Sequence, residues 1–212
     1  QAYSGPSSAL VSINCDDDDS PSGLMPAIYP ADGLTGLTPG DTIWFAVWEY
    51  GNNSFGTFEI CAWEPPGPPA NDEISGAIEL PLGVGSCSGP LVGNNTSATN
   101  SGIAHTCASY NGGDVWYYVI VPAGGTFTVE TYTNGGFTDG GMQAYSGPSS
   151  APVSIDCDDD DSPSGLMPAI YPADGLVGLT PGDTSWFAVW EYGHNAFGTF
   201  EICVWRPASD DL

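Results

Sequence analysis

The chain has 212 residues, with 26 acidic side chains against a single Lys or Arg, which gives a formal net charge of -25. Nucleic acids and anionic membrane surfaces are bound through cationic side chains, so this charge excludes both as partners. Hydrophobic residues make up 41%, enough for a packed core, and no apolar run approaches the roughly 18 residues of a membrane-spanning helix. The sequence therefore predicts a folded protein with no membrane span, whose repelling acids need metal ions, salt or spacing.

Residues 1–65 return near the other end of the chain as residues 143–207. The two copies differ at eight positions, which are Leu10/Pro152, Asn14/Asp156, Thr35/Val177, Ile43/Ser185, Asn52/His194, Ser54/Ala196, Ala62/Val204 and Glu64/Arg206. A repeat of this length indicates tandem domains. Residues 71–142, which we call the front half, occur once, between the copies. We call residues 1–65 the first back half and residues 143–207 the second back half.

This arrangement predicts the domain boundaries. We expect a complete β-sandwich repeat over 70–207 and the C-terminal half of another over 1–63. Between them, "EPPGPP" at 64–69 predicts a stiff, proline-rich linker. The last residues, "ASDDL" at 208–212, resemble "ANDEI" at 70–74, so we expect a further repeat to start there.

Strand patterns dominate the complete repeat, and turn residues separate them. The segment "DVWYYVIV" (114–121) is apolar throughout, as in a central strand, and "GTFTVETYT" (125–133) alternates. Further on, "SWFAVWEY" (185–192) places Phe187 and Val189 on one face, and "GTFEICVW" (198–205) gathers Phe200, Ile202 and Val204. The predicted fold class is all-β, with tandem jelly-roll-type β-sandwich modules of which the first is present only as its C-terminal half.

Several stretches resemble a known family. "GDVWY", "TDGGMQAYSG" and "VWEYG", within a similarity that covers nearly all of 70–205, are similar to the pre-peptidase C-terminal-like β-sandwich modules. Such modules recur in tandem in large secreted surface proteins of gliding-type bacteria. The resemblance implies a secreted β-sandwich that binds or spaces, without catalysis. Ile74 stands where the family often has a Cys, so the resemblance leaves the disulfide pairing open.

The stretch "CDDDDSPSG" occurs in both back halves and predicts a calcium site. Ca²⁺ takes six to eight oxygen ligands, often carboxylates of one short loop. The candidate ligands are the two runs, with Asp114 and Asp139 as additional donors; the runs are Asp16, Asp17, Asp18 and Asp19, and Asp158, Asp159, Asp160 and Asp161. The alternative is a solvated acidic loop. The lack of countercharge favours calcium.

Six cysteines at repeated spacing indicate disulfides and an oxidising compartment. Because one spacing recurs in both back halves, we expect one bridge in each and a third in the front half. The expected pairs are Cys15 with Cys61, Cys157 with Cys203, and Cys87 with Cys107. Free thiols are the alternative.

Glycosylation and sugar binding are the other surface features to weigh. Asn52, Asn94 and Asn95 begin N-glycan acceptor patterns, and Thr42 in "DTI" resembles an O-glycan pattern of the same bacterial surface proteins. The tryptophans at strand spacing could stack on sugars, although such residues more often form core.

No convincing catalytic group emerges. "GSCSG" (85–89) resembles a nucleophile elbow but lacks a following helix and a convincing His partner. We therefore expect an extracellular or cell-surface structural protein and no enzyme. It would be the repeat unit of a head-to-tail fibre, in which strands from outside this segment complete residues 1–65. The alternative is an adhesin or carbohydrate-binding accessory module of a larger secreted protein.

Overall fold

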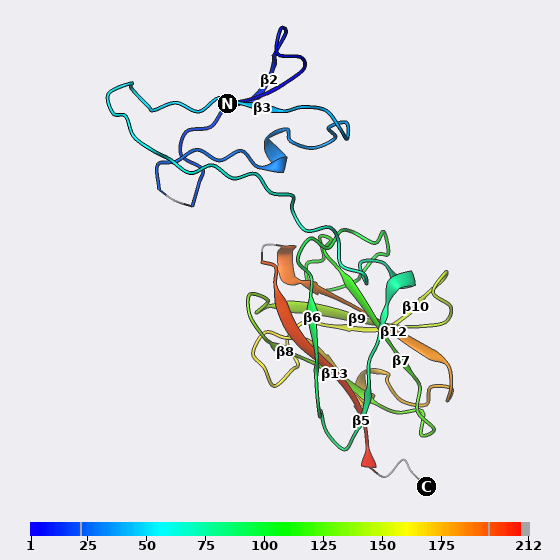
Figure 1. Cartoon of the computed structure of the whole chain (residues 1–212). Coiled ribbons are helices and arrows are strands. Elements are labelled where there is room, and N and C mark those ends of the chain that lie inside the picture. Colours follow the sequence, from blue (N-terminus) through cyan, green and yellow to red (C-terminus); the bar gives the residue numbers. More distant parts are fainter. Residues whose placement is uncertain (22, 195, 209–212) are drawn as a thin grey trace. The chain divides into compact units, whose positions relative to one another are not determined.

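A computed structural model describes residues 1–21, 23–194 and 196–208. The chain divides into two compact units, Gln1–Ala62 and Trp63–Leu212, and each is considered by itself. Strands in sheets dominate the second unit, whereas the first unit has three short strands and is otherwise irregular (Figure 1). The helical turns of the described residues are short 3-10 segments, namely η1 (Pro30–Asp32), η2 (Ile74–Gly76), η3 (Pro172–Asp174) and η4 (Tyr192–His194). The all-β class predicted from the sequence is therefore confirmed. The jelly-roll arrangement in tandem stays a prediction.

The second unit contains two sheets. The first is five-stranded, in the order β10 (Val153–Asp158), β9 (Gly140–Ser146), β12 (Thr184–Glu191), β7 (Val115–Ile120) and β4 (Ile78–Glu79). The second runs in the order β11 (Ala169–Ile170), β8 (Thr128–Thr133), β13 (Thr199–Arg206) and β5 (Leu82–Val84), with β6 (Leu91–Asn94) also paired to β13. Each sheet combines strands of the front half with strands of the second back half, so neither half could build a sheet of this size alone.

A single apolar core lies between the two sheets. Phe187 and Val189 of β12 face it from one side, and Phe200, Ile202 and Val204 of β13 from the other. All five are essentially inaccessible to solvent. The alternation predicted for these two segments is therefore confirmed, and the second unit is sandwich-like.

The outer face of the first sheet carries a second, smaller cluster. Trp116, Ala188 and Trp190 are buried there beneath Ala108 of the loop 95–113. The indole nitrogen of Trp190 donates to the carbonyl of Ala108 at 3.0 Å. Because this loop covers the outer face, β12 is buried on both sides, which explains its almost continuous apolar sequence.

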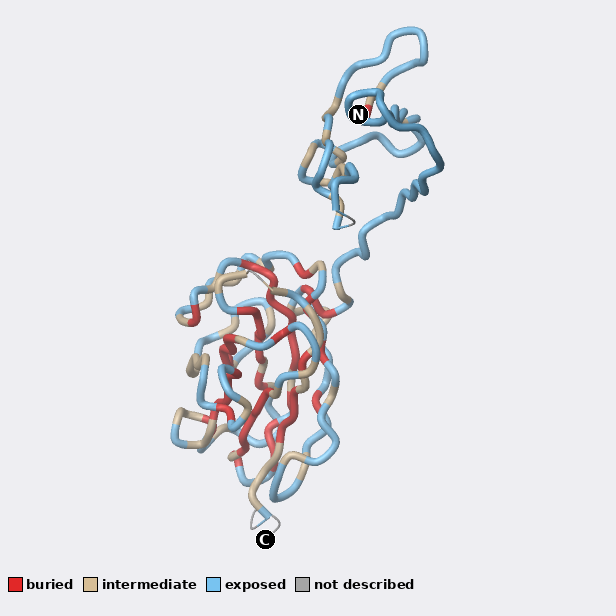
Figure 2. Tube along the Cα trace, turned by 90° about the vertical axis from the view of Figure 1, so that its left-hand side faces the viewer, coloured by how far each residue is buried: buried red, intermediate tan, exposed pale blue. Residues whose placement is uncertain are grey.

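The first unit contains one small sheet, in the order β2 (Val11–Asn14), β1 (Ala2–Ser4) and β3 (Trp44–Phe45). Among its described residues, only Ala2 is buried. Figure 2 shows the same difference, since buried segments run through the strands of the second unit and are nearly absent from residues 1–62. The first back half thus has strands but no core of its own.

Two points concern the rest of the chain. The predicted start of a further repeat lies, apart from Ala208, outside the described residues. Over the part of the chain that the structure describes, no helix has the length and apolar character needed to cross a bilayer.

Candidate functional site

The most distinctive surface feature of the first unit is a set of apolar side chains without cover. We call this set the open face, and it comprises the exposed residues Phe45, Val47, Trp48, Phe58 and Ile60. The counterparts of four of them lie in the core of the second unit, and Trp190, the counterpart of Trp48, lies in the outer cluster. In the second back half every counterpart is buried. Trp48 is 58% exposed whereas Trp190 is 0% exposed, although the two residues occupy the same place in the repeat. Large exposed apolar patches are uncommon on folded monomers and often belong to interaction surfaces.

The front half is what covers the corresponding residues in the second unit. Phe187 packs edge-to-face on Phe127 with ring centroids 6.1 Å apart, and Phe200 packs in the same way on Tyr117 at 6.1 Å. Phe127 and Tyr117 both belong to 71–142. The open face therefore lacks the partners that an equivalent front half would supply.

The two back halves nevertheless share their local geometry. Strand β1 pairs with β3 in the same register as β9 with β12, since Tyr3 opposes Trp44 as Tyr145 opposes Trp186. The indole of Trp44 donates to the Gly5 carbonyl at 3.0 Å, and the indole of Trp186 donates to Gly147 at 3.0 Å. Hence the first unit already has the framework on which a front half rests in the second.

The predicted disulfides are wrong. Cys87 is bonded to Cys203 and Cys107 to Cys157, so both bridges join the front half to the second back half. The predicted Cys15–Cys61 bridge is absent as well, because both of these cysteines are free and exposed.

The two sheets explain the error. Cys157 lies on β10 and packs in the outer cluster of the first sheet. Cys203 lies on β13 of the second sheet and alternates with Ile202 and Val204, which face the core. The two cysteines are thus on opposite outer sides of the sandwich, and a disulfide cannot span two sheets.

The aspartate runs form tight loops with one carboxylate turned inward in each. In the first unit, Asp16 Oδ2 accepts from the amides of Asp19 at 3.2 Å and Ala27 at 2.7 Å. In the second, Asp158 Oδ2 accepts from the amides of Asp161 at 3.1 Å and Ala169 at 2.9 Å. The first aspartate of each run therefore organises the loop, whether or not a cation binds.

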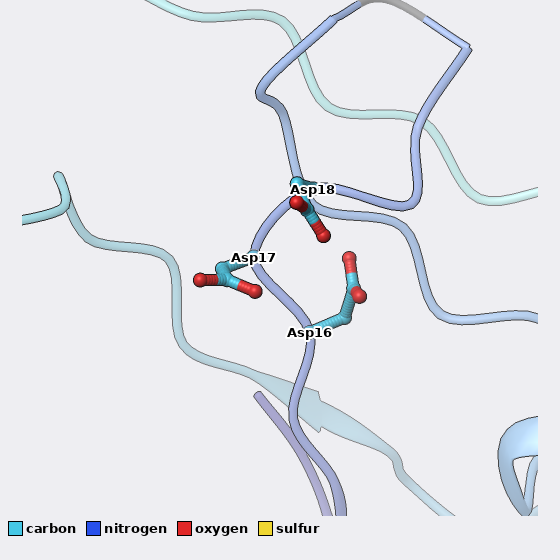
Figure 3. A group of neighbouring side chains, drawn as sticks. All are labelled: Asp16, Asp17 and Asp18. Atoms are coloured by element: carbon cyan, nitrogen blue, oxygen red, sulfur yellow. The ribbon is translucent and has the colours of Figure 1, made fainter.

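The remaining carboxylates of each run gather near the first. Asp16, Asp17 and Asp18 each offer an oxygen within 4.8 Å of the others, and Asp158, Asp160 and Asp161 do the same. Figure 3 shows the first group, in which the side chains of Asp16 and Asp18 point toward each other. Asp19 and Asp159 are not among these groups. Three carboxylate oxygens suit a hard cation but fall short of the six to eight that Ca²⁺ takes, so water or carbonyl oxygens would have to supply the rest.

The environment of the two runs differs in a way that the pKa values report. Hydrogen bonding, chiefly from the Ala27 amide, lowers the pKa of the exposed Asp16. Burial raises the pKa of Asp158, even though the equivalent amides, those of Ala169 and Asp161, donate to its carboxylate. Asp139 has a raised pKa as well, first because of burial and then because of the charges of Glu191, Asp159 and Asp160. Burial therefore affects the inward carboxylate of the second run more strongly than that of the first.

The front half also fixes the second acidic loop in place. The Ser162 hydroxyl donates to the Thr131 carbonyl at 2.6 Å, and the Ser164 hydroxyl accepts from the Thr133 amide at 3.1 Å. Gly140 donates to the Leu166 carbonyl at 2.9 Å. All three contacts join the loop to residues of 71–142, so the front half anchors the second acidic loop as well as covering the core.

Asp114 belongs to another site. Its carboxylate accepts from the Ser101 hydroxyl at 2.5 Å, the Tyr110 hydroxyl at 2.6 Å and the Trp116 indole at 2.8 Å. His105 Nε2 lies 3.4 Å from the same carboxylate, and both side chains are fully buried. Burial by itself would raise the pKa of Asp114, but the bonds from His105, Ser101 and Tyr110 outweigh it and lower the pKa. The prediction of Asp114 as a calcium ligand is wrong, because both of its oxygens are engaged in this network.

The residue pattern did not predict the network around Asp114. The His105 ring stacks on Trp190 with centroids 4.5 Å apart and contacts the Tyr145 hydroxyl through Nδ1. These residues come from the loop 95–113 and from two strands of the second back half. The nearness of His105 and Asp114 in sequence was the only available signal. The network ties the loop to the outer face and has no exposed reactive group.

The predicted glycan acceptors differ in accessibility. Asn52, Asn94 and Thr42 are exposed. Asn95 is fully buried, and its Oδ1 accepts from the Gly198 amide at 2.9 Å. A folded module therefore offers Asn94 but not Asn95 to a glycan-transferring enzyme.

Comparisons of this chain with protein-family models, with curated proteins and with solved structures gave no match. The arguments about function therefore rest on the repeat and on the geometry described above.

Proposed function

We propose that this chain is an extracellular structural protein, a repeat unit of a head-to-tail fibre or surface filament. One observation carries the proposal. The same back-half sequence occurs twice, once with its apolar residues buried by a front half and once with them exposed on the open face. An apolar face and unpaired strand edges favour association with further polypeptide.

The association that this geometry favours is directional. A front half that covers residues 1–62 would have to come from outside residues 1–212, since the front half of this chain already covers residues 143–207. A contact between two different surfaces does not close on itself and propagates into a filament. The linker "EPPGPP" then spaces successive sandwiches, because proline-rich segments are extended and stiff.

Calcium is part of the proposal. The two acidic loops each gather three carboxylates, and the chain has only one basic side chain among 212 residues to offset them. A divalent cation would remove repulsion among these groups and fix the loops at the ends of their strands. Asp139, a residue of the front half, lies near the second run and would add charge to that site.

The disulfides support the proposed extracellular location. Two bridges join the halves of the second unit, and bridges of this kind persist in oxidising compartments. The resemblance to pre-peptidase C-terminal-like modules points in the same direction. Exposed acceptors at Asn52, Asn94 and Thr42 are compatible with a glycosylated surface.

The structure does not favour the alternative of a carbohydrate-binding module. Aromatic side chains at Trp48 and Phe45 are exposed, but their counterparts Trp190 and Phe187 are fully buried when a front half is present. The exposed rings therefore mark missing cover. A glycan array separates the two functions, because a structural repeat shows no saturable sugar binding.

The test of the fibre combines microscopy of the native material with proteolysis of the 212-residue chain. We expect filaments with a regular axial repeat in negative stain. In the isolated chain, we expect subtilisin to cleave residues 1–62 well before the second unit, since nothing buries them. A monodisperse monomer in sedimentation velocity, with residues 1–62 as resistant as residues 63–207, would contradict the proposal.

A further inference from the structure

Cys15 and Cys61 are free and exposed, yet their counterparts in the repeat are both bridged. Cys15 corresponds to Cys157, which is bonded to Cys107, and Cys61 corresponds to Cys203, which is bonded to Cys87. The two partners lie in the front half. The first back half therefore has two thiols at the positions where a front half forms covalent bonds.

The strand framework around Cys15 matches that around Cys157. In the first unit Ala2 opposes Asn14 and Tyr3 opposes Ser12, with an irregularity between them. In the second unit the corresponding residues of β9 and β10 are opposed in the same way, with the same irregularity. The side-chain amide of Gln1 donates to the Ser12 hydroxyl at 2.7 Å, and the side-chain amide of Gln143 donates to the Ser154 hydroxyl at 2.6 Å. Cys15 is thus already held where its partner would reach it.

The surroundings of both thiols lack only the front half. Beside Cys157, the outer cluster is completed by Ala108 and Trp116, which cover Trp190, and the corresponding Trp48 is open. Beside Cys203, β13 pairs with β8 on one side and with β5 and β6 on the other. Ile60, the neighbour of Cys61, is 65% exposed, whereas Ile202 is 0% exposed.

We propose that a second front half, of the sequence type of residues 71–142 and from outside this 212-residue chain, docks on residues 1–62 and is locked there by two disulfides. Cys15 bonds to its cysteine at the Cys107 position, and Cys61 bonds to its cysteine at the Cys87 position. The inference rests on the proposed head-to-tail completion and adds that the joint is covalent.

Each new bond requires an oxidant, for which a small-molecule or protein disulfide suffices. The thiolate of Cys15 attacks one sulfur of the oxidant disulfide and forms a mixed disulfide with it, while the other oxidant sulfur leaves as a thiolate and takes up one proton. The incoming cysteine, which loses its own proton, then attacks the mixed disulfide at the Cys15 sulfur and releases the second oxidant thiol. Two such cycles reduce two oxidant disulfides to four thiols and oxidise four cysteines to two protein disulfides, so the electrons balance.

The test adds a second front half to the full chain. Residues 71–142 are fused before Gln1, so that Met142 joins Gln1 as it joins Gln143 in the natural sequence, and the protein is folded with reduced and oxidised glutathione. Thiols are counted in denaturant and located by alkylation and non-reducing peptide mapping. Peptides of the two back halves are distinguishable, because Asn14 and Ala62 are replaced by Asp156 and Val204.

We expect the two free thiols of the 212-residue chain to disappear in the extended chain. A matched control with Cys87→Ser and Cys107→Ser in the added copy only should retain free thiols at Cys15 and Cys61. If residues 1–62 become resistant to subtilisin while both thiols stay free, or if Cys15 bonds to Cys61, the covalent joint is wrong and the fibre survives. If residues 1–62 stay sensitive, both proposals fail.

Discussion

The first and second back halves have almost the same sequence and differ in nearly everything that depends on distant contacts. The segment that forms β12 over Thr184–Glu191 forms only β3 over Trp44–Phe45 in the first unit. The segment that forms β13 over Thr199–Arg206 has no strand counterpart among the described residues of the first unit. The pair is therefore an internal control, in which one sequence is seen with and without its complement.

What the two copies retain lies within the back half itself. The Tyr29 hydroxyl donates to the Asp19 carbonyl at 3.1 Å, and the Tyr171 hydroxyl donates to Asp161 at 3.2 Å. The backbone amides of the same tyrosines donate to the carboxylates of Asp32 and Asp174, the last residues of the two 3-10 turns of "PAD". Turns and caps of this kind involve residues a few positions apart, so they form without the front half. The difference between the copies teaches that the front half supplies the core, the long strands and the disulfides.

The largest effect should come from a buried ring compared with its exposed twin. Phe200→Ala removes a fully buried side chain and should lower the free energy of unfolding of the second unit by about 3–5 kcal/mol. Phe58→Ala alters a ring that is 55% exposed and should cost under about 0.5 kcal/mol. Urea unfolding followed by tryptophan fluorescence measures both. Equal costs would mean that the open face is buried in the isolated chain.

The bridged and free cysteines sharpen the comparison next. The double variant Cys107→Ser and Cys157→Ser opens a bridge between residues 50 apart in sequence. It should lower the free energy of unfolding by about 3 kcal/mol. The twin Cys15→Ser should leave the 212-residue chain unchanged, because Cys15 is free. Thermal unfolding without reductant distinguishes them, and a loss caused by Cys15→Ser would overturn the assignment.

The next prediction concerns Asp114, whose buried network joins the loop 95–113 to the second back half. Asp114→Asn should lower the free energy of unfolding by roughly 2–3 kcal/mol at neutral pH, because the buried donors of Ser101, Tyr110 and Trp116 lose a charged acceptor. The exposed Asp41→Asn is the control.

The same variant carries a pH dependence. The lowered pKa of Asp114 in the folded state means that its contribution is complete above the unfolded pKa of about 3.9. That contribution is lost as the pH falls through the folded pKa. Denaturant titrations should therefore show the stability difference between the wild-type chain and Asp114→Asn shrinking below about pH 4. A difference that is constant down to the lowest pH would show that the carboxylate charge does not stabilise the network.

The smallest effect concerns calcium. At low ionic strength, Ca²⁺ at ten times its dissociation constant should stabilise the second unit by about 1.4 kcal/mol, and EDTA should reverse this. Asp160→Asn should reduce the effect, whereas Asp18→Asn in the twin loop should leave the second unit unaffected. An unchanged melting temperature in EDTA would identify the runs as solvated loops.

Some of the site could be predicted and some could not. The alternation of Phe187 and Val189 with Trp186 and Trp190 could be predicted, because successive side chains of a strand point to opposite faces of the sheet. The disulfides could not be predicted, because equal spacing in the two back halves does not indicate in which sheet each cysteine lies. The buried Asn95 and the network of Asp114 with His105 were missed for the same reason, since their burial comes from residues far away in sequence.

The sequence by itself determined the all-β class, the repeat, the turns and the acidic loops, because each depends on residue types within a few positions. Only the tertiary structure decided which cysteines bond, which aspartates gather, and whether Trp48 and Trp190 are exposed or buried. The physical reason is that a sheet face is covered by whichever segment packs on it. Two nearly identical sequences can share every local bond and still differ in their core when only one of them has that segment.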